Sequence, residues 1–328
     1  MDVMQIIGTG LTAALGPVGA FYALAAMGLN IHYGYTGLLN FGQVAFMMVG
    51  GYGMAISVAI FELPFLVGVL IGLAAAAVLA LILGIPTLRL RADYLAITTI
   101  AAGEILRLLI NSSPATQFTG GPFGLPSQVS DNRRFTTTFL EWNPIPAGDY
   151  GFSTIKFNAT SLWLLVVLWL LVALTAWAIH AIMRSPWGRV IKSIREDEDA
   201  ARSLGKNVFV YKMQSLVMGG LLGGLAGIGM SLTLSNANPV NFLPQVTFFA
   251  FTIMILGGAA TVTGPVAGSI AFWFLVAGLD QAIRDAGMLP SGTEGAFRLA
   301  FVGLGLMLLI VFRPQGILGN KQELMLNG

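Results

Sequence analysis

Long apolar runs recur along the whole chain, and they limit its possible folds more than any other feature. A helix needs about 20 apolar residues to cross the hydrocarbon core of a bilayer. Runs of this kind lie at residues 5–29, 36–60, 64–84, 93–111, 160–182, 212–234, 245–262, 264–283 and 296–312. The alternation in segments of about 10 residues that marks a membrane β-barrel is missing. The sequence therefore predicts an all-α polytopic integral membrane protein with about nine transmembrane helices, within a range of roughly eight to ten.

Some of these helices are expected to be broken, because glycine-rich stretches interrupt the apolar runs. Residues 34–53 carry Asn40 and Gln43 in an apolar context, and residues 257–268 lie between two expected spans. Two interpretations stay open for both stretches: interrupted helices that line a pathway, or helices that pack closely. Residues 219–229 favour close packing, since small residues on one face let helices approach each other in lipid.

One pair of ionisable residues falls well inside an expected span. Glu104 and Arg107 lie three residues apart, so they share a helix face and can form an ion pair. Because a charge in lipid is costly, such residues mark either a pathway or a protein contact. A gate or pathway lining and an ion pair at a helix–helix or subunit interface both remain open. Together with Asn40 and Gln43, these two residues are the candidate pathway or gate residues.

The charged residues of the chain are concentrated in one segment, residues 184–212. Seven of the seventeen Lys and Arg residues lie there. Because Lys and Arg are enriched in cytoplasmic loops, we expect this segment to be cytoplasmic. Residues 112–159 hold few basic residues and many Pro, Ser, Thr and Asn, so they should lie on the extracytoplasmic side. The chain is then one transmembrane domain over residues 1–328, with these two segments at opposite faces.

The segment 184–212 also carries local signals for short helices. Pro186 is suited to the first turn of a helix that starts after Ser185. The acids at 196–199 favour a second helix N-terminus, where negative charge opposes the dipole, and Gly205 is suited to end that helix. Such a helix, with alanines on a narrow face, could enter a groove on a soluble partner. The alternative is a solvated loop whose charges only set the topology.

Several functional classes find no support in the sequence. His32 and His180 are the only histidines, and no HExxH, GxSxG or GxxxxGK[ST] motif occurs. We therefore expect no catalytic residues, no metal site and no cofactor in this chain, and if ATP powers it, another subunit must hydrolyse the nucleotide. Cysteine is absent and the net charge is only +2, so thiolate sites and nucleic-acid binding are not expected either.

At this point a resemblance to a known family becomes specific. Asp199-Ala200-Ala201, three further residues and Gly205 resemble the Glu-Ala-Ala coupling motif of ATP-binding-cassette importer permeases, with Asp in place of Glu. Other blocks are similar to the branched-chain amino acid permease family, in particular its longer permease subunit. In chain order the blocks are MGLNIHYGYTGLLNFGQVAF (27–46), LRLRADYLAITTIAAGEILRLLIN (88–111), TGGPFGL (119–125), WGRVIKSIREDEDAARSLGKNVFVYK (187–212), LGGAATVTGP (256–265) and FRPQGILG (312–319).

The resemblance implies an importer subunit of a bacterial or archaeal cytoplasmic (inner) membrane that translocates branched-chain amino acids by alternating access. Its expected partners are a homologous second permease, two cytoplasmic ATPase subunits, an extracytoplasmic substrate-binding protein and membrane lipid. The coupling helix would run from about 196 to 205. The residues implied to contact the ATPase are Glu196, Asp197, Glu198, Asp199, Ala200, Ala201 and Gly205. Gln43 stands where many relatives have His, and Ala102 where many have Gly, so the substrate preference stays open. Relatives that resemble this chain import urea or short amides, which is the alternative cargo.

Two rival functions remain open at this stage. One is a secondary transporter driven by Na⁺ or H⁺, which would be expected to bury more acids than Glu104. The other is a membrane enzyme that holds Mg²⁺ through clustered acids, for which residues 196–199 form the one candidate cluster.

Overall fold

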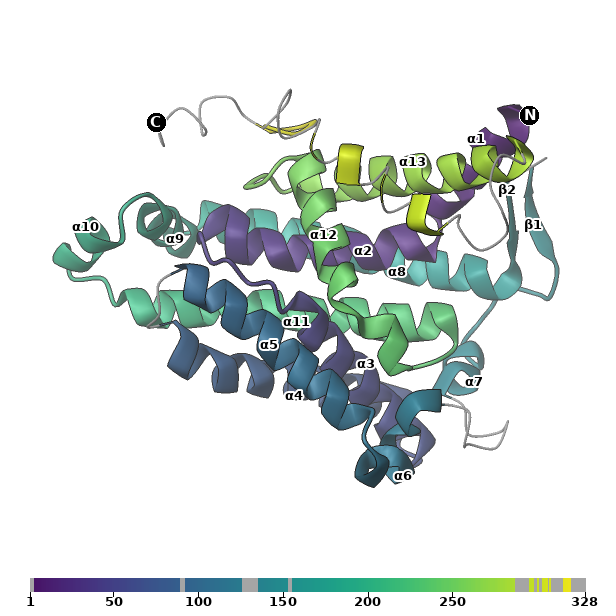
Figure 1. Cartoon of the computed structure of the whole chain (residues 1–328), viewed down its shortest axis with the longest axis horizontal. Helices are drawn as coiled ribbons and strands as arrows, with labels where there is room; N and C mark the ends of the chain where they lie inside the picture. The colour runs from purple at the N-terminus through teal and green to yellow at the C-terminus, as the bar shows by residue number, and fades with distance from the viewer. Residues whose placement is uncertain are drawn as a thin grey trace.

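The chain folds as a bundle of membrane helices with one small β-hairpin (Figure 1). The computed structural model describes residues 3–88, 92–125, 135–152, 155–286, 295–297, 300, 303–305, 307 and 315–319. The longer helices are α1 (Val3–Leu15), α2 (Pro17–Leu29), α3 (Gln43–Ala59), α4 (Phe65–Thr87), α5 (Ala92–Ile110), α8 (Ala159–Arg184), α9 (Pro186–Glu196), α11 (Val208–Leu234), α12 (Pro244–Gly257) and α13 (Gly264–Ala286). The shorter elements are the π-helix η1 (Asn30–Tyr35), η2 (Ser113–Ala115), α6 (Thr116–Thr119), η3 (Gly121–Phe123), α7 (Phe135–Leu140), β1 (Asp149–Phe152), β2 (Ile155–Asn158), α10 (Glu198–Ser203) and η5 (Pro239–Phe242).

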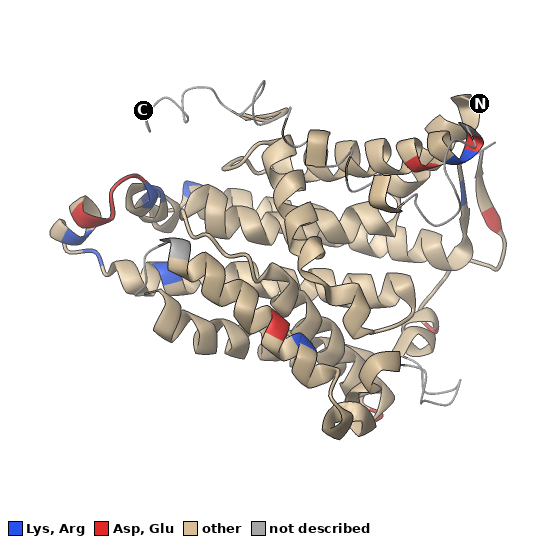
Figure 2. Cartoon of the chain, viewed as in Figure 1, with Lys and Arg blue, Asp and Glu red and all other residues tan. Residues whose placement is uncertain are grey.

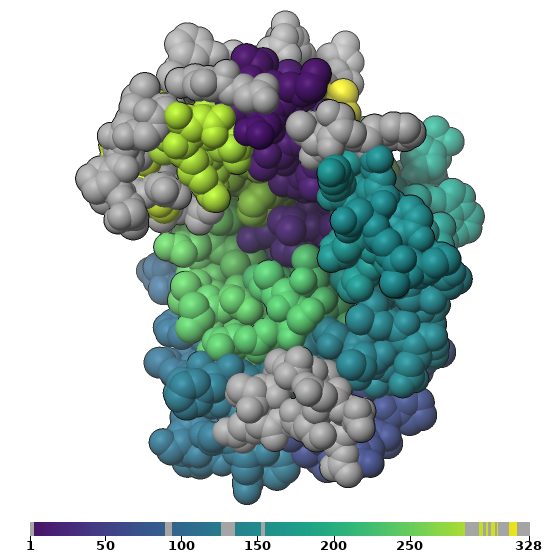
Figure 3. Space-filling model, turned by 90° about the vertical axis from the view of Figure 1, so that its right-hand side faces the viewer, coloured from purple at the N-terminus to yellow at the C-terminus, as the bar shows by residue number. Residues whose placement is uncertain are grey.

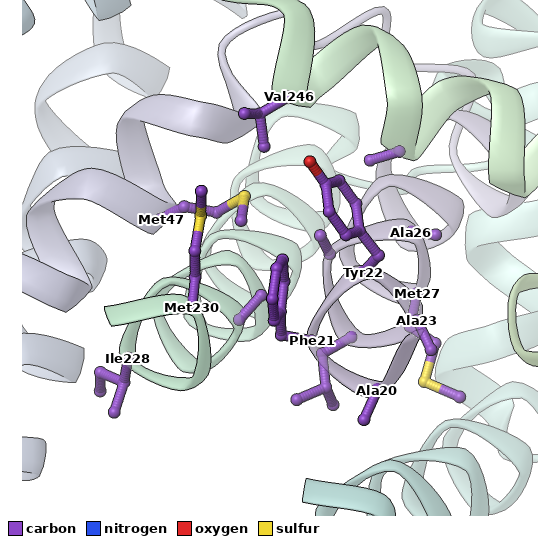
Figure 4. Packing of buried hydrophobic residues seen from close by; sticks show 14 of the residues in the cluster. Ala20, Phe21, Tyr22, Ala23, Ala26, Met27, Met47, Ile228, Met230 and Val246 are labelled. Carbon is purple, nitrogen blue, oxygen red and sulfur yellow. The ribbon is translucent and has the colours of Figure 1, made fainter. Parts of the chain in front are cut away.

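Helices α2, α3 and α11 form the centre of the bundle. Every residue of α2 except Val18 is buried, and two thirds of the apolar part of α11 is buried, against 33% for α4 and 22% for α8. Figure 4 shows Phe21 and Tyr22 of α2 among side chains from α3, α11 and α12, including Met47, Met230 and Val246. All these helices are apolar, so hydrophobicity alone does not sort them into core and periphery.

Small residues explain which helices lie in the centre. Gly50 of α3 lies so close to Gly224 of α11 that a Cβ on Gly50 would stand 2.4 Å from the Cα of Gly224. Gly227 packs in the same way against the backbone of Met47. Close approach of this kind supplies van der Waals contact, which drives helix association in lipid. The prediction of close packing for residues 219–229 is therefore confirmed.

The first expected span, residues 5–29, is broken rather than continuous. Its two halves, α1 and α2, meet at an angle of 48°. Pro17 lacks an N–H and cannot continue α1, and Gly16 is extended with ψ 178°. The indole N–H of Trp169 donates to the carbonyl of Leu15 at 2.6 Å, which satisfies one backbone acceptor that the break leaves free.

A second interruption separates α2 from α3. The π-helix η1 follows α2 directly, residues 36–42 are not regular helix, and α3 begins only at Gln43. The expected span 36–60 therefore starts seven residues later than its apolar run suggested. The interpretation of residues 34–53 as part of an interrupted helix is confirmed in geometry, and the loop of residues 258–263 between α12 and α13 is a further break.

The fold class agrees with the prediction, but the number of spans is not confirmed. Among the described residues four helices are long and apolar enough to cross a membrane, or up to six if each bent pair is one span. Helices α3 and α12 are apolar but shorter. Of the run expected at 296–312, the structure describes only residues 296, 297, 300, 303–305 and 307, so this span lies mostly outside the described residues.

Charged side chains gather at the two ends of the bundle (Figure 2). Helices α9 and α10 lie at one end, while the start of α1 and the β1–β2 hairpin lie at the other (Figure 1). The described parts of the segment 112–159 form short helices and the hairpin, with Tyr150 paired to Phe157. The two segments expected on opposite sides of the membrane therefore lie at opposite ends of the structure.

The end that carries the hairpin is closed by contacts between loops. Leu125 and Ala237 exchange backbone hydrogen bonds of 2.9 and 2.7 Å, and the side-chain amide of Asn238 donates to the carbonyls of Pro122 and Phe123. Figure 3 shows this end, with the green segment that follows α11 at its centre. The block TGGPFGL thus forms a compact turn, in which Gly120, Gly121 and Gly124 all have positive φ.

Candidate functional site

Helices α9 and α10 form a charged projection at one end of the bundle. Ser185 is extended and Pro186 occupies the first turn of α9, as predicted. Helix α9 buries Gly188, Ile191 and Ile194 against the bundle and exposes its basic face. The projection is therefore anchored by an apolar stripe, while Arg189 and Lys192 face outward.

Asp197 starts the second helix of the projection. Its backbone is extended and its side chain accepts a hydrogen bond of 2.9 Å from the N–H of Ala200, an N-cap that satisfies a free donor. Glu196 instead ends α9, so the expected helix start at residue 196 was two residues early. Gly205, at φ +76°, ends the segment in the left-handed conformation, as predicted.

Three of the acids at residues 196–199 are engaged in ion pairs or in a helix cap, and two of them share Arg202. Glu198 pairs with Arg202 at 2.9 Å and with Lys212, and Asp199 pairs with Arg202 at 3.0 Å. Asp197 caps the helix. In the described part of the chain there is no group of three or more His, Cys, Asp or Glu that could hold a metal ion. The geometry of these acids is that of helix capping and charge pairing.

Only one of the two alanines of the motif is available to a partner. Ala201 is 3% exposed and packs with Ile194 and Val208, so the expectation that both alanines share a free face is wrong for this residue. Ala200 is exposed, and Leu204 is 80% exposed at the tip. A leucine held in water at the tip of a charged projection is a feature that a protein contact would stabilise.

A second group of polar residues lies inside the bundle, where α2 gives way to α3. Asn40 donates to Gln43 at 3.3 Å, so the structure brings these two predicted residues together. The group also contains His32, which the sequence analysis did not select. Asn40 donates to Nδ1 of His32 at 3.0 Å, and Nε2 of His32 bonds to the carbonyl of Leu216 at 3.1 Å. All three side chains are essentially fully buried.

These partners determine the protonation of His32. A carbonyl oxygen can only accept, so Nε2 must carry the proton, and Nδ1 must be the acceptor for the amide of Asn40. The imidazole is therefore neutral and held in one tautomer. Gln43 in turn donates to the carbonyl of Gly219 at 3.1 Å. We call His32, Asn40 and Gln43 the interior polar cluster.

Other side chains satisfy the backbone at the same interruption. Asn30 donates to the carbonyl of Thr261 at 2.7 Å and accepts from the N–H of Ala260 at 2.8 Å. The N–H of Phe41 donates to Thr99 of α5, and the N–H of Val44 donates to Thr247 of α12. Irregular backbone at membrane depth is tolerated where protein groups replace the missing helical hydrogen bonds. The interruption is thus stabilised by specific hydrogen bonds from side chains.

Glu104 and Arg107 form the expected ion pair, apart from the interior polar cluster. The guanidinium donates twice to the carboxylate, at 2.9 and 2.5 Å. The side chains are 37% and 16% exposed, on a helix that also exposes Ile105, Leu108 and Leu109. In Figure 2 the acidic and basic positions in the middle part of α5 lie between the two charged ends of the bundle.

Two further buried polar groups were not identified from the sequence. The hydroxyls of Tyr52 on α3 and Ser231 on α11 are buried, and neither has a hydrogen-bond partner among the described residues. Their isolation depends on packing between helices, so no sequence signal could have revealed it.

Five of the six sequence blocks that suggested a family meet around this interruption, and the block at 119–125 lies instead at the hairpin end. Residues 27–46 contact residues 88–111 through Thr99 and residues 256–265 through Thr261. They contact residues 187–212 through Arg195, which donates to the carbonyl of Gly34. The described part of 312–319 joins the same region, because Ile317 and Leu318 donate to the carbonyls of Leu256 and Gly257.

Comparison with known proteins gives a consistent result. Residues 13–311 match the family model described as branched-chain amino acid transport system / permease component. The chain is 29% identical over 314 residues to the high-affinity branched-chain amino acid transport system permease protein LivM of Escherichia coli (strain K12), covering 94% of this chain and 70% of that protein. It is 30% identical to LivM of Salmonella typhimurium, covering 90% and 67%. It is also 26% identical to the permease protein LivH of Escherichia coli, covering 93% of both chains.

Proposed function

The chain belongs to the branched-chain amino acid transport permease family, and from this we propose that it is the membrane subunit of an ATP-driven importer of branched-chain amino acids. It is a multi-pass membrane protein with an all-α fold. We place it in the cytoplasmic (inner) membrane of a bacterium or archaeon. The names of its relatives support the cargo, because LivM and LivH are both named for high-affinity branched-chain amino acid transport.

The second permease subunit is proposed from the relatives. In one Escherichia coli strain, LivM and LivH carry the same system name, and each aligns with more than 90% of this chain. We infer that this chain pairs with a homologous second permease. The ion pair on α5 supports a protein contact there, since a charged pair facing lipid is costly. Helix α4, by contrast, exposes Leu70, Val78, Ile82 and other purely apolar side chains, as a lipid-facing helix should.

The ATPase subunits are proposed to dock on α10. The features that support this are the capped helix, the exposed Ala200 and Leu204 and the outward-facing Asp199, which is 89% exposed. ATP hydrolysis belongs to the partner, and we assign no chemical step, metal or cofactor to this chain. An extracytoplasmic substrate-binding protein is proposed to dock at the opposite end, on described parts of residues 112–159.

Transport by alternating access then needs a structural element with two arrangements. ATP binding and hydrolysis would change the contacts of α10 with the ATPase, and only a difference in those contacts between two states can shift the equilibrium. The interrupted region between α2 and α3 is the element proposed to rearrange. It lies in the centre of the bundle, and its backbone is held by side chains that can exchange partners. Tyr52 and Ser231, on the helices that border it, offer free polar groups to a passing amino acid or its water.

The single observation that carries this proposal is the projection of α10 from a membrane bundle whose chain matches the family over residues 13–311. The test is affinity purification of the chain from mild detergent, together with leucine uptake into the same membranes. We expect an ATPase and a second permease to co-purify, and Ala200→Trp to abolish ATPase capture. The matched control is Lys192→Trp, on the exposed face of α9, which should leave capture intact.

The outcomes separate the candidate functions. Leucine uptake by membranes in which the chain captures no ATPase would overturn the ATP-driven importer and favour an ion-driven transporter. If uptake is blocked by excess urea but not by isoleucine or valine, the proposed cargo is wrong and urea takes its place. The assignment of the chain as a permease would still hold.

A further inference from the structure

Arg195 makes a contact that its sequence neighbours do not predict. It lies in the last turn of α9, directly before the acids of residues 196–199. Within the described residues it forms no ion pair with a carboxylate; of those acids, Glu198 and Asp199 are paired with Arg202 and Lys212 instead. The guanidinium donates to the backbone carbonyl of Gly34 at 2.5 Å. A cation next to four acids has thus turned toward the interior of the bundle.

The acceptor lies at the end of the π-helix η1. Carbonyls in the last turn of a helix lack a partner within the helix and carry its negative dipole end, so an arginine there is favourable. Neighbouring carbonyls of η1 are satisfied locally, since Gly37 donates to Tyr33 and Leu38 donates to His32. Arg195 supplies the donor for Gly34. The stem of Arg195 also passes close to Gly37, which has φ +76°.

The π-helix carries the residues that hold the interruption together. Asn30, at its start, binds the loop of residues 258–263, and His32 binds both Asn40 and the carbonyl of Leu216. Gly34 packs directly against the Asn30 side chain and the N–H of Ala260. A displacement of Gly34 therefore reaches the interior polar cluster and the α12–α13 loop within one helical turn.

The other side of the contact is rigidly joined to α10. Only Asp197 separates α9 from α10, and Ala201 of α10 packs against Ile194 of α9. Glu198 of α10 pairs with Lys212 at the start of α11. Figure 1 shows α9 lying between α10 and the end of the central bundle. Helices α9 and α10 can thus move as one body, with Arg195 as its attachment to η1.

We propose that Arg195 is a positioning residue that transmits the movement of α10 to the interrupted span through the carbonyl of Gly34. This inference rests on the proposed function and adds to it the route from the ATPase contact to the centre of the bundle. Arg195 touches neither ATPase nor cargo in this route. Its loss should therefore separate ATP hydrolysis from transport, rather than abolish assembly.

The experiment uses the complete transporter, purified with its partner subunits and reconstituted with its binding protein in proteoliposomes. Leucine uptake and ATP hydrolysis are measured on the same samples for the wild type and for Arg195→Met, which keeps the apolar stem but removes every donor. We expect the ATPase subunits to be retained and hydrolysis to continue, with the ratio of leucine transported to ATP hydrolysed falling about tenfold. Arg195→Lys keeps one cationic donor and should restore part of the ratio.

Arg189→Met is the matched control. Arg189 lies on the same helix and is exposed, and among the described residues its side chain bonds only to the carbonyl of Arg184, at 3.5 Å. The ratio of leucine transported to ATP hydrolysed in Arg189→Met should therefore equal that of the wild type. If Arg195→Met does not reach the membrane, Arg195→Gln is compared with Arg195→Lys in the same way. An unchanged ratio, an equal loss in the Arg189 control, or loss of the ATPase subunits from the Arg195 variant would each overturn the proposal. A wild type that shows no leucine-dependent hydrolysis would contradict the proposed function instead.

Discussion

At the scale of single residues, His32 and Asn40 show how polar side chains replace helical backbone bonds inside an apolar bundle. Each is buried, and each bonds to groups on other segments, so neither leaves a polar atom facing lipid. An unsatisfied buried polar group costs about 1–3 kcal/mol. Complete pairing is therefore the condition under which a span can be interrupted at all.

In the described part of the chain, Tyr52 is one of several buried polar groups that lack such a partner, and its role in transport can be tested. Its hydroxyl is buried without a partner among the described residues, so Tyr52→Phe should leave the melting temperature in detergent unchanged or raise it. If the hydroxyl serves the pathway, leucine uptake should fall about fivefold, the effect of one hydrogen bond of about 1 kcal/mol. Tyr150→Phe, which removes a hydroxyl bonded to Pro146 on the exposed hairpin, is the control. Normal uptake by Tyr52→Phe would remove this residue from the pathway.

At the scale of elements, α10 depends on its two ends. Asp197 satisfies the first turn, and Gly205 ends the segment in a left-handed conformation that costs an ordinary residue about 1–2 kcal/mol. No atom lies within 4 Å of the place where a Gly205 Cβ would stand. Within the described chain, glycine is thus favoured here by its backbone conformation and not by lack of space.

Substitution of Gly205 can separate conformation from side-chain size. Asn tolerates the left-handed region and Val does not. We expect Gly205→Asn to retain most ATPase capture and Gly205→Val to weaken it by about five- to thirtyfold, measured by co-purification and binding kinetics. Equal losses in both variants would show that the partner's groove, and not the backbone, requires glycine.

Helix α5 carries a prediction of its own through Glu104 and Arg107. Removing one charge leaves the other without a partner, whereas removing both leaves neither. The double variant Glu104→Gln/Arg107→Gln should therefore yield more assembled complex and more uptake than either single variant, by about threefold. The measurement is size-exclusion yield with leucine uptake. Additive losses would indicate separate roles for the two residues, as expected of a gate.

At the scale of the whole molecule, the two ends of the bundle differ in kind. One end carries the charged projection of α9 and α10, and the other carries the hairpin and the closed loops around Leu125 and Ala237 (Figures 1 and 2). A permease that binds an ATPase on one side of the membrane and receives its substrate on the other side needs two different ends. The interrupted span between the two ends is where their movements would meet.

The orientation of this polarity can be measured directly, because the chain contains no cysteine. Phe123→Cys and Leu204→Cys place single thiols at side chains that are 71% and 80% exposed, at opposite ends of the bundle. We expect an impermeant maleimide to label Cys at 123 in intact cells, and Cys at 204 only after permeabilisation. The reverse pattern would invert the proposed topology and separate α10 from any cytoplasmic ATPase.

Local sequence signals determined several features correctly. The length of the apolar runs identified a helical membrane protein, the spacing of Glu104 and Arg107 predicted their ion pair, and Pro186 and Gly205 predicted a helix start and a helix end. Each of these predictions depends on residues within one or two helical turns of each other, or on the overall hydrophobicity of a whole segment. The sequence blocks that resemble the family could also be read from the sequence, but their contacts in space could not.

Tertiary packing decided the rest. His32 is bonded to Leu216, and Asn30 to Thr261, across 184 and 231 residues of sequence. Ala201 is buried and Ala200 is free because α10 lies on Ile194 and Val208, a contact that two adjacent alanines cannot disclose. In a chain where nearly every helix is apolar, hydrophobic pattern no longer distinguishes core from surface. Close backbone approach and hydrogen bonds between distant segments make that distinction, and they exist only once the chain has folded.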